Sequence, residues 1–466
     1  MQPSARFMEV KAAMTERRFN LVVPLAHKAT AMRTTDTSGS SRAASGAVSP
    51  LSNRPGDVDS TMVPLTPGTR TSTTATRTTT ARAPRSARSL SADWKESEGF
   101  TGAELVKAYR DCRRTKRNTA SALAFEANLE RNLVHLNAKL LDDSYVPGRS
   151  KCFVIDRPKH REVWAAEFRD RIVHHLLYNR IGPRFERSFI ADSCACIKGR
   201  GTLYAAQRLD AKVRSITQNW SKPAHYLKCD LANFFVSIDK RVLLDLLLSK
   251  IPEPFWRGLT ELVLMHDPRE DFVYLGDPGM IDRVPPHKRL MEQPAHLGLP
   301  IGNLSSQFFA NVYLNELDQF VKHELRCRHY IRYVDDFVLL HESPQWLNEA
   351  HDAIAVFLPT RLGARLNPKK TILQPVSRGI DFMGQVIRPW VRHTRKRTLN
   401  VGIQRLREMP AEEVFAAANS YFGLLRQATG SHADRARVAN VARKRGHAIN
   451  KQFTKAYRAA SSAKES

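Results

Sequence analysis

The segment HYIRYVDDFVLLH, residues 329–341, constrains the fold more than any other stretch of the 466-residue chain. Its two apolar runs are rich in β-forming residues, and the adjacent acids Asp335 and Asp336 separate them. An unpaired buried charge is among the most costly features that a fold can contain. The segment therefore predicts a β-hairpin whose turn holds both acids next to a positive partner. The alternative is a surface hairpin turn, because Asp is common in turns.

A third acid, Asp230, ends the predicted strand in AHYLKCDLANFFVSID. A βαββαβ sheet can bring the end of this strand beside the hairpin turn, so that Asp230 and Asp335 converge. Three carboxylates that lie together cannot all stay ionised without counter-charge, and hard divalent cations with oxygen ligands commonly supply it. We therefore expect two Mg²⁺ ions held by Asp230, Asp335 and Asp336. Two such ions about 4 Å apart are the usual means of in-line phosphoryl transfer.

The charge balance indicates a polyanionic partner. The chain has 73 Lys and Arg residues against 46 Asp and Glu residues, which gives a formal charge of +27. This surplus is larger than solubility requires, and it is spread along the whole chain. Nucleic acid is the first candidate partner, and a solvated basic surface without a partner is the alternative.

Cysteine usage and hydropathy predict a soluble intracellular protein. The six cysteines are scattered, and the close pair Cys194 and Cys196 lacks the CxxC spacing of a zinc site. No apolar run reaches the roughly 18 residues that span a bilayer. The first twenty residues are charged throughout, unlike a secretory signal. We expect reduced thiols, no membrane association and a cytoplasmic location.

Composition and periodicity divide the chain into an extension and an ordered part. Residues 30–91 are a mixture of Ser, Thr, Ala, Arg and Pro with scarcely an aromatic residue, which predicts a disordered basic extension over residues 1–94, although a transit peptide has a similar composition. Apolar spacings of three and four predict two helices within residues 92–145. The clearest helix covers residues 303–325, where Asn303 or Ser305 can cap its start.

The sequence blocks of the middle of the chain, and their order, resemble the reverse transcriptases. The resemblance is to the prokaryotic branch that includes group II intron, retron and diversity-generating retroelement enzymes, and it runs from about Val154 to Gly384. The matching blocks are RPKHREVWAAEFRDRIVHHLL, SCACIKGRGTLYAA, CDLANFFVSID, YVDD, LNPKKT and IDFMGQVI. The resemblance implies an α+β right-hand polymerase fold with fingers, a ferredoxin-like palm of antiparallel sheet and helices, and a helical thumb.

The resemblance also implies domain boundaries. After the extension of residues 1–94, residues 95–215 would form the N-terminal helices and fingers. Residues 216–394 would form the palm with an inserted fingers segment, and residues 395–466 a basic helical thumb.

Several residues acquire expected roles from the resemblance. Lys159 and Arg161 would contact the incoming triphosphate, although both can equally be surface charges. Phe235 would be the gate that excludes a ribose 2′ hydroxyl, whereas the alternative is a core aromatic beside Phe234. Lys370 would contact the nucleotide, although its neighbour Lys369 leaves that assignment open. The primer grip would comprise Phe382, Met383 and Gly384.

The block LPIGNLSSQFFAN departs from the common family pattern, which reads approximately PQG followed by SP. Ile301 stands where Gln is usual, Gln307 stands where Pro is usual, and Gly302 lies between them. This pattern is similar to that of the diversity-generating class, which copies a template RNA with errors at adenines. An apolar side chain discriminates by shape alone, typically by about 1 to 3 kcal/mol, which would lower fidelity. The alternative is that Ile301 merely packs under the following helix.

The sequence therefore predicts an RNA-directed DNA polymerase that serves a diversity-generating retroelement. The expected partners are the template RNA, the cDNA primer or product, deoxynucleotides and a small helical accessory protein. A retron-like or defence-associated reverse transcriptase is the alternative within the same class. A catalytically idle RNA-binding scaffold is the alternative of another class, and the three intact acids argue against it.

Overall fold

The computed structural model describes residues 99–116, 119–156 and 159–458. The predicted disordered extension, residues 1–94, lies entirely outside these residues. Among the helices of the described ranges, none is both long and apolar enough to cross a membrane.

The ordered part begins with three helices, where the spacing of apolar residues predicted two. They are α3 (Gly102–Lys116), α4 (Ala120–Ala127) and α5 (Leu129–Leu141). Thr119 caps α4 by accepting a hydrogen bond from the Ala122 amide. Asn128 has non-helical backbone angles and alone separates α4 from α5. A one-residue break leaves the apolar spacing continuous, which is why the pattern concealed it.

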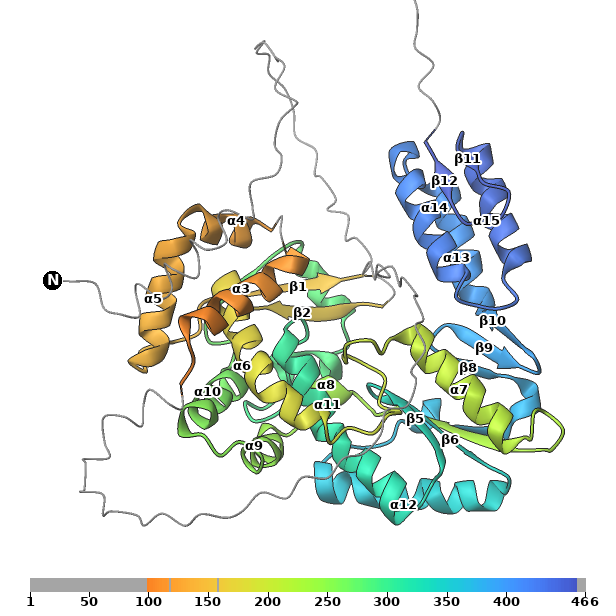
Figure 1. Cartoon of the computed structure of the whole chain (residues 1–466), viewed down its shortest axis with the longest axis horizontal. Helices are drawn as coiled ribbons and strands as arrows, with labels where there is room; N and C mark the ends of the chain where they lie inside the picture. The colour runs from red at the N-terminus through yellow and green to blue at the C-terminus, as the bar shows by residue number, and fades with distance from the viewer. Residues whose placement is uncertain (1–98, 117–118, 157–158, 459–466) are drawn as a thin grey trace, which may run out of the picture. The chain divides into compact units, whose positions relative to one another are not determined.

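A small sheet packs near these helices. Strands β1 (Ser150–Ile155) and β2 (Arg161–Ala165) form an antiparallel pair, and β4 (Phe272–Tyr274) lies parallel to β1. The long helix α6 (Phe168–Glu186) follows β2 and packs against α3, α10 (Pro254–Met265) and α11 (Figure 1).

The central sheet has four antiparallel strands in the order β5–β6–β3–β7. The strands are β3 (His225–Cys229), β5 (His329–Tyr333), β6 (Asp336–His341) and β7 (Ile372–Pro375). Taken in chain order, the first strand lies between the third and the fourth, which is the ferredoxin-like arrangement that the βαββαβ pattern predicts. The α+β palm is therefore present as expected.

Helices cover both faces of this sheet. On one face, α11 (Leu304–Gln319) and α12 (Pro344–Leu362) pack in the largest apolar core. On the other face lie α7 (Thr202–Ile216) and the small sheet β8 (Ile380–Phe382), β9 (Gln385–Arg388) and β10 (Val391–Thr394). The remaining helices between β3 and α11 are α8 (Phe234–Ser237), α9 (Lys240–Leu248) and three short 3-10 helices within residues 278–292.

The clearest predicted helix is present but starts differently from the expectation. Asn303 stands before α11 without a capping bond from its side chain to the helix. Its Oδ1 instead accepts a hydrogen bond of 3.1 Å from the amide of Ala166, just after β2. The helix continues into a π-turn over Phe320–Glu324. The residue before α11 thus connects two segments rather than capping one.

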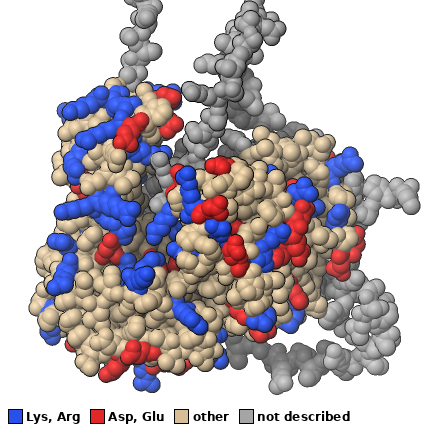
Figure 2. All heavy atoms as spheres, turned by 180° about the vertical axis from the view of Figure 1, so that it is seen from behind, with Lys and Arg blue, Asp and Glu red and all other residues tan. Residues whose placement is uncertain are grey.

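The C-terminal part forms a bundle with its own core. It contains α13 (Lys396–Glu408), α14 (Ala411–Leu425) and α15 (His432–Lys444), and its apolar cluster lies within residues 399–456. The two short strands β11 (Ala448–Ile449) and β12 (Ala456–Tyr457), and β10 before the bundle, were not predicted. Lys and Arg side chains gather on the visible face of the bundle (Figure 2), as the basic sequence predicts.

Candidate active site

Three acids meet at one end of the central sheet. Asp230 directly follows β3, and Asp336 begins β6. The two strands pair through Cys229 and Phe337, so Asp230 and Asp336 extend from neighbouring positions. Asp335 lies in the turn just before β6. We call β5, β6 and this turn the acidic hairpin.

The turn of the acidic hairpin has an unusual backbone. Tyr333 pairs with Asp336, which leaves Val334 and Asp335 as a two-residue turn. Val334 has a φ of 54°, a left-handed value that is uncommon for a β-branched residue. Its carbonyl accepts a hydrogen bond of 3.1 Å from Arg332 Nη1. The surrounding structure therefore holds a strained turn, a feature that often accompanies functional sites.

Burial and mutual repulsion set the protonation of the acids. Burial, followed by the charges of Asp230 and Asp336, raises the pKa of Asp335 to about 6. Burial also raises the pKa of Asp336, although the charge of Lys228 opposes this shift. Asp230 is 4% exposed, and Lys370 Nζ lies 2.6 Å from both of its carboxylate oxygens. The raised pKa values show that the chain neutralises the cluster incompletely.

The donor set fits a divalent cation whose coordination a substrate completes. Within the described ranges, no group of three or more His, Cys, Asp or Glu side chains is arranged to hold a metal ion by itself. Mg²⁺ commonly takes one or two carboxylates together with water and substrate phosphates, rather than a complete protein cage. An incompletely neutralised set of carboxylates beside a cavity has this form.

A cavity of about 550 Å³ lies against the acids, and we call it the central cavity. Asp230 and Asp335 line it. So do other residues that the sequence analysis singled out, namely Lys159, Arg161, Phe235, Ile301 and Lys370. These residues come from five separate segments of the chain. A cavity of this volume suits a ligand of nucleotide size.

Residues 156–387 match the family described as "Reverse transcriptase (RNA-dependent DNA polymerase)". The chain contains a reverse transcriptase domain. The match confirms the predicted right-hand polymerase fold.

Among solved structures, the chain is similar to the telomerase from Candida albicans in complex with a TWJ fragment of telomeric RNA. The identity is 12%, the TM-score is 0.41, and the similarity covers 64% of this chain and 55% of that chain. The chain thus spans about half the length of that protein, and the likeness is too distant to bear on function. No curated protein matches the chain.

The two phenylalanines after β3 of the reverse transcriptase domain have different surroundings. The single-turn helix α8 begins after Asn233, whose φ of 50° is left-handed. Both rings line the central cavity, but Phe234 is 3% exposed and belongs to the core, whereas Phe235 is only partly buried. The ring centroids of the pair lie 5.4 Å apart. The backbone therefore places Phe235 where a bound nucleotide would contact it, and its role as a gate stays a prediction.

The segment before α11 contacts β2 through its backbone. The Ile301 carbonyl accepts a hydrogen bond of 2.8 Å from the Trp164 amide. Gly302 has a φ of 133°, and a Cβ there would lie 2.7 Å from the Trp164 carbonyl oxygen. Gln307 is exposed on the first turn of α11 and is not among the residues that line the central cavity. Ile301 and Gln307, which the same sequence block singled out, therefore have different surroundings.

The predicted primer grip is the connection between β8 and β9. Phe382 is fully buried in the apolar core under the central sheet. Met383 and Gly384 form the turn, with φ values of 48° and 80°. The Gly384 carbonyl accepts a hydrogen bond of 2.9 Å from the amide of Arg395, which immediately precedes α13. This turn connects the palm to the C-terminal bundle and lies apart from the residues lining the central cavity.

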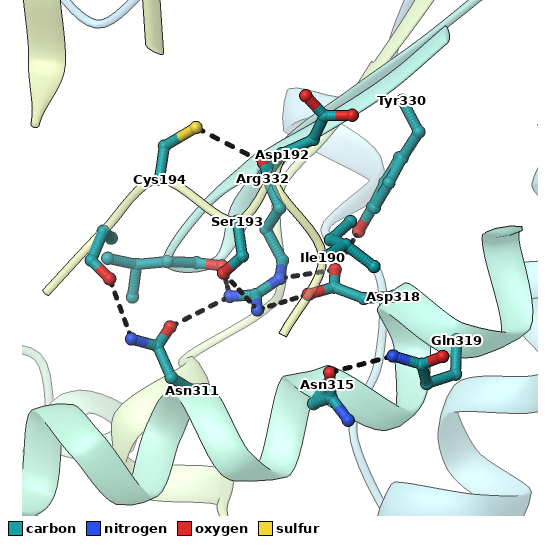
Figure 3. Close-up of polar contacts among 12 residues, drawn as sticks. Ile190, Asp192, Ser193, Cys194, Asn311, Asn315, Asp318, Gln319, Tyr330 and Arg332 are labelled. Atoms are coloured by element: carbon teal, nitrogen blue, oxygen red, sulfur yellow. Dashed lines mark hydrogen bonds and ion pairs between the residues drawn. The ribbon is translucent and has the colours of Figure 1, made fainter. Parts of the chain in front are cut away.

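A fully buried arginine anchors the acidic hairpin to α11 (Figure 3). Arg332 Nε and Nη2 lie 2.7 and 2.6 Å from the two carboxylate oxygens of Asp318. Nη2 also donates to Ser193 Oγ at 3.0 Å, and Nη1 donates to Asn311 Oδ1 at 3.3 Å. The Tyr330 hydroxyl donates to Asp318 at 2.7 Å. This network holds β5 just before the acidic turn.

Sequence reasoning did not single out the Arg332 network or one wall of the central cavity. The only sequence signal for the network is a charged residue within the apolar run HYIRYV. The additional residues lining the cavity include Asp156, His160, Glu162, Arg283, Val284, Pro285, Lys288 and Asn367. Four of these lie in a proline-rich stretch without helical or strand periodicity, where only the positive charge was a signal.

Proposed function

We propose that the reverse transcriptase domain copies a template RNA into cDNA by two-metal nucleotidyl transfer. The observation that carries this proposal is the convergence of Asp230 and Asp335 on one cavity that Lys159 and Arg161 also line. Asp230, Asp335 and Asp336 would hold two Mg²⁺ ions. When bound, such ions activate a primer 3′ hydroxyl and stabilise the leaving pyrophosphate.

The chain's own residues bind and orient the substrates in this proposal. Lys159 and Arg161 bind the triphosphate, because cations at a cavity edge pair with phosphate oxygens. The Phe235 ring excludes a ribose 2′ hydroxyl by contact. Lys370 contacts the nucleotide beside Asp230. The turn of Phe382, Met383 and Gly384 supports the primer.

Primer extension tests the enzymatic proposal. Full-length protein with an RNA template, an annealed DNA primer, deoxynucleotides and Mg²⁺ should give extended cDNA, and chelation of the metal should abolish it. Asp335→Ala should abolish extension, whereas Asp352→Ala should not, since its side chain is 82% exposed on α12. Extension that is absent from the wild type, or unchanged in Asp335→Ala, would favour the idle RNA-binding scaffold.

Phe235→Ala isolates the gate. Removing the ring should increase incorporation of ribonucleotides relative to deoxynucleotides, because the steric filter is lost. Phe185→Leu, a conservative change in the core at a residue that does not line the cavity, is the control and should leave the ratio unchanged. An unchanged ratio in Phe235→Ala would return Phe235 to an ordinary packing role.

We propose further that the domain is error-prone and serves a diversity-generating retroelement. The sequence IGNLSSQ supports this subtype, and the position of Ile301 on the central cavity supports an effect on pairing. Ile301→Gln should lower misincorporation at template adenines, because an amide adds a hydrogen-bonding criterion to discrimination by shape. Ile372→Gln, at an exposed position of β7, is the control. Unchanged adenine errors in sequenced cDNA from Ile301→Gln would exclude this role.

Neighbouring DNA separates this subtype from a retron or defence role. An imperfect repeat pair that differs mainly at adenines, beside a small helical reading frame, would favour diversification. A structured non-coding RNA without such repeats would favour a retron.

The remaining assignments concern domains, partners and location. We propose fingers over residues 95–215, palm over 216–394 and thumb over 395–466, and the separate apolar core within residues 399–456 supports the last boundary. The basic face of this bundle suits phosphate contacts with template and product (Figure 2), and it also suits a small helical accessory protein. A cytoplasmic location agrees with the six cysteines, all within the described residues, which form no disulfide there.

A further inference from the structure

One wall of the central cavity comes from the stretch between α10 and α11, which we call the 277–292 segment. It contains three short 3-10 helices, Pro278–Arg283, Pro286–Lys288 and Leu290–Glu292. Arg283, Val284, Pro285 and Lys288 of this segment line the same cavity as Asp230 and Asp335. The segment thus places two cations and an apolar pair opposite the acids.

Buried contacts hold the 277–292 segment against the β1–β2 pair. Leu290 is 4% exposed and packs with Cys152 and Trp164 of that pair. The carboxylate of Glu162, also 4% exposed, accepts a hydrogen bond from the Leu290 amide. Glu162 directly follows Arg161, so the segment is attached beside one of the proposed phosphate-binding residues. Buried contacts therefore fix the position of this wall in the fold.

Two arginines stabilise the segment from within and from behind. Arg289 Nε donates to the Val284 carbonyl at 2.7 Å. Arg269 Nη1 donates to the Leu290 carbonyl at 3.1 Å, and Asp267 binds the same guanidinium. These arginines donate hydrogen bonds to backbone carbonyl oxygens and hold the segment in place. Their guanidinium groups therefore bind partners within the protein.

Arg283 and Lys288 differ from these arginines in their surroundings. Both side chains are exposed, and neither forms a hydrogen bond or an ion pair with any residue in the parts of the chain that the structure describes. The neighbouring half-buried Arg269 and Arg289 are paired, whereas these two exposed cations line the cavity without a partner from the described residues. Unpaired cations at a cavity of nucleotide size suit an anionic ligand.

We propose that Arg283 and Lys288 bind the phosphates of the incoming nucleotide. This inference rests on the proposed polymerase function and adds a second cationic wall to that of Lys159 and Arg161. Pro285, which is exposed, lies between the two cations in sequence and offers an apolar surface to the sugar or base. The alternative ligand is the template backbone. A cavity of about 550 Å³ suits one nucleotide, whereas a continuous strand requires an extended groove.

Steady-state primer extension and direct binding test this assignment. In Arg283→Ala and Lys288→Ala the KM for dTTP should rise about tenfold each, because each variant loses a charge-assisted contact with the phosphates. The kcat and the Kd for annealed primer and template should change less than about twofold, since the lost contact is with the nucleotide. Arg283→Lys should recover most of the affinity.

His287→Ala is the matched control, because His287 is exposed on the same segment and is not among the residues that line the cavity. It should leave the KM for dTTP unchanged. An unchanged KM in both cation variants would show that these residues are merely solvated. A raised Kd for primer and template with an unchanged KM would assign them to the template backbone and overturn the proposal.

Titration of dTTP and Mg²⁺ into the full-length protein by calorimetry keeps this test separate from the proposed function. If the wild type extends primers and the variants bind dTTP as tightly as it does, only the present inference fails. If the wild type does not extend primers, the proposed function fails. A loss of dTTP binding in Arg283→Ala would still support the site in that case, and intact binding would exclude it.

Discussion

Two charged residues of the acidic hairpin lie three positions apart and have opposite surroundings. Arg332 is fully buried, yet Asp318, Asn311, Ser193 and a backbone carbonyl receive its hydrogen bonds, and its pKa stays raised (Figure 3). Burial, together with the charges of Asp230 and Asp336, raises the pKa of Asp335 to about 6. Partners within the fold balance the charge of Arg332. The charge of Asp335 is left for a ligand from outside the chain to balance. Within one strand pair, Arg332 thus serves stability and the nearby Asp335 serves the proposed chemistry.

Removing the charge of Asp335, which the fold does not balance, should have the largest effect on activity. Asp335→Asn should lower the rate of primer extension by at least about a thousandfold, equivalent to about 4 kcal/mol, because a metal ligand is lost. It should not lower the free energy of unfolding, since the change also removes repulsion within the cluster. Extension assays and thermal unfolding of the same preparation check both outcomes.

A loss of stability in Asp335→Asn would contradict the comparison, because the acid would then contribute to the fold. Asp352→Asn on α12 is the control and should change neither measurement.

Removing the charge of Arg332, which partners within the fold balance, should lower stability. Arg332→Met should lower the free energy of unfolding by about 3 to 5 kcal/mol, because Asp318 would remain buried without its partner. Denaturant unfolding measures this loss. Arg332→Lys should recover part of it, since a single ammonium cannot reproduce both contacts.

Arg328→Met, an exposed change just before β5, is the matched control and should cost little. An Arg332→Met protein as stable as the wild type would show that the network is not needed to hold the hairpin.

His174 represents a third case, a titratable group for which burial outweighs the nearby charges. Burial lowers its pKa to about 4, the charge of Asp170 opposes the shift weakly, and Ser305 Oγ lies 3.4 Å from Nδ1. The unfolded chain, with a His pKa near 6.5, therefore takes up the proton first. The stabilising contribution is complete above pH 6.5 and should fall by up to about 3 kcal/mol as the pH drops towards 4.

Urea unfolding at several pH values between 4 and 7 checks this dependence. His174→Gln should flatten the profile in this range, because its side chain does not titrate. An identical slope in the wild type and the variant would show that other groups cause the acid sensitivity.

The smallest effect concerns the partly solvated pair of Lys370 and Asp230. Lys370 is 49% exposed, so Lys370→Met should lower the free energy of unfolding by less than about 1 kcal/mol. Lys369→Met, at the adjacent exposed position, should leave it unchanged. Chemical denaturation of the two variants measures the difference. If Lys370→Met lost several kcal/mol of free energy of unfolding, the fold would balance the charge of Asp230 as fully as that of Asp318.

The sequence sufficed to predict the order of strands in the palm and the meeting of Asp230 with the acidic turn. Both follow from local patterns, namely short apolar strands that end in acids. It did not predict the partners of Arg332, because Ser193 lies 139 residues away in sequence and no local pattern encodes that contact. The 277–292 segment escaped notice for a related reason. Its proline-rich turns have no periodicity. Its position depends on a buried hydrogen bond that the Leu290 amide donates to the Glu162 carboxylate.

The contact between Gly302 and Trp164 has a consequence for how this polymerase can evolve. The backbone of residues 301 and 302 is bonded to β2 or packed against it so closely that a side chain at 302 would clash. The Ile301 side chain faces the cavity and takes no part in that attachment. The side chain at position 301 can therefore be exchanged while the backbone attachment to β2 stays constant. If Ile301 has the proposed effect on pairing, evolution could alter it there without disturbing the scaffold.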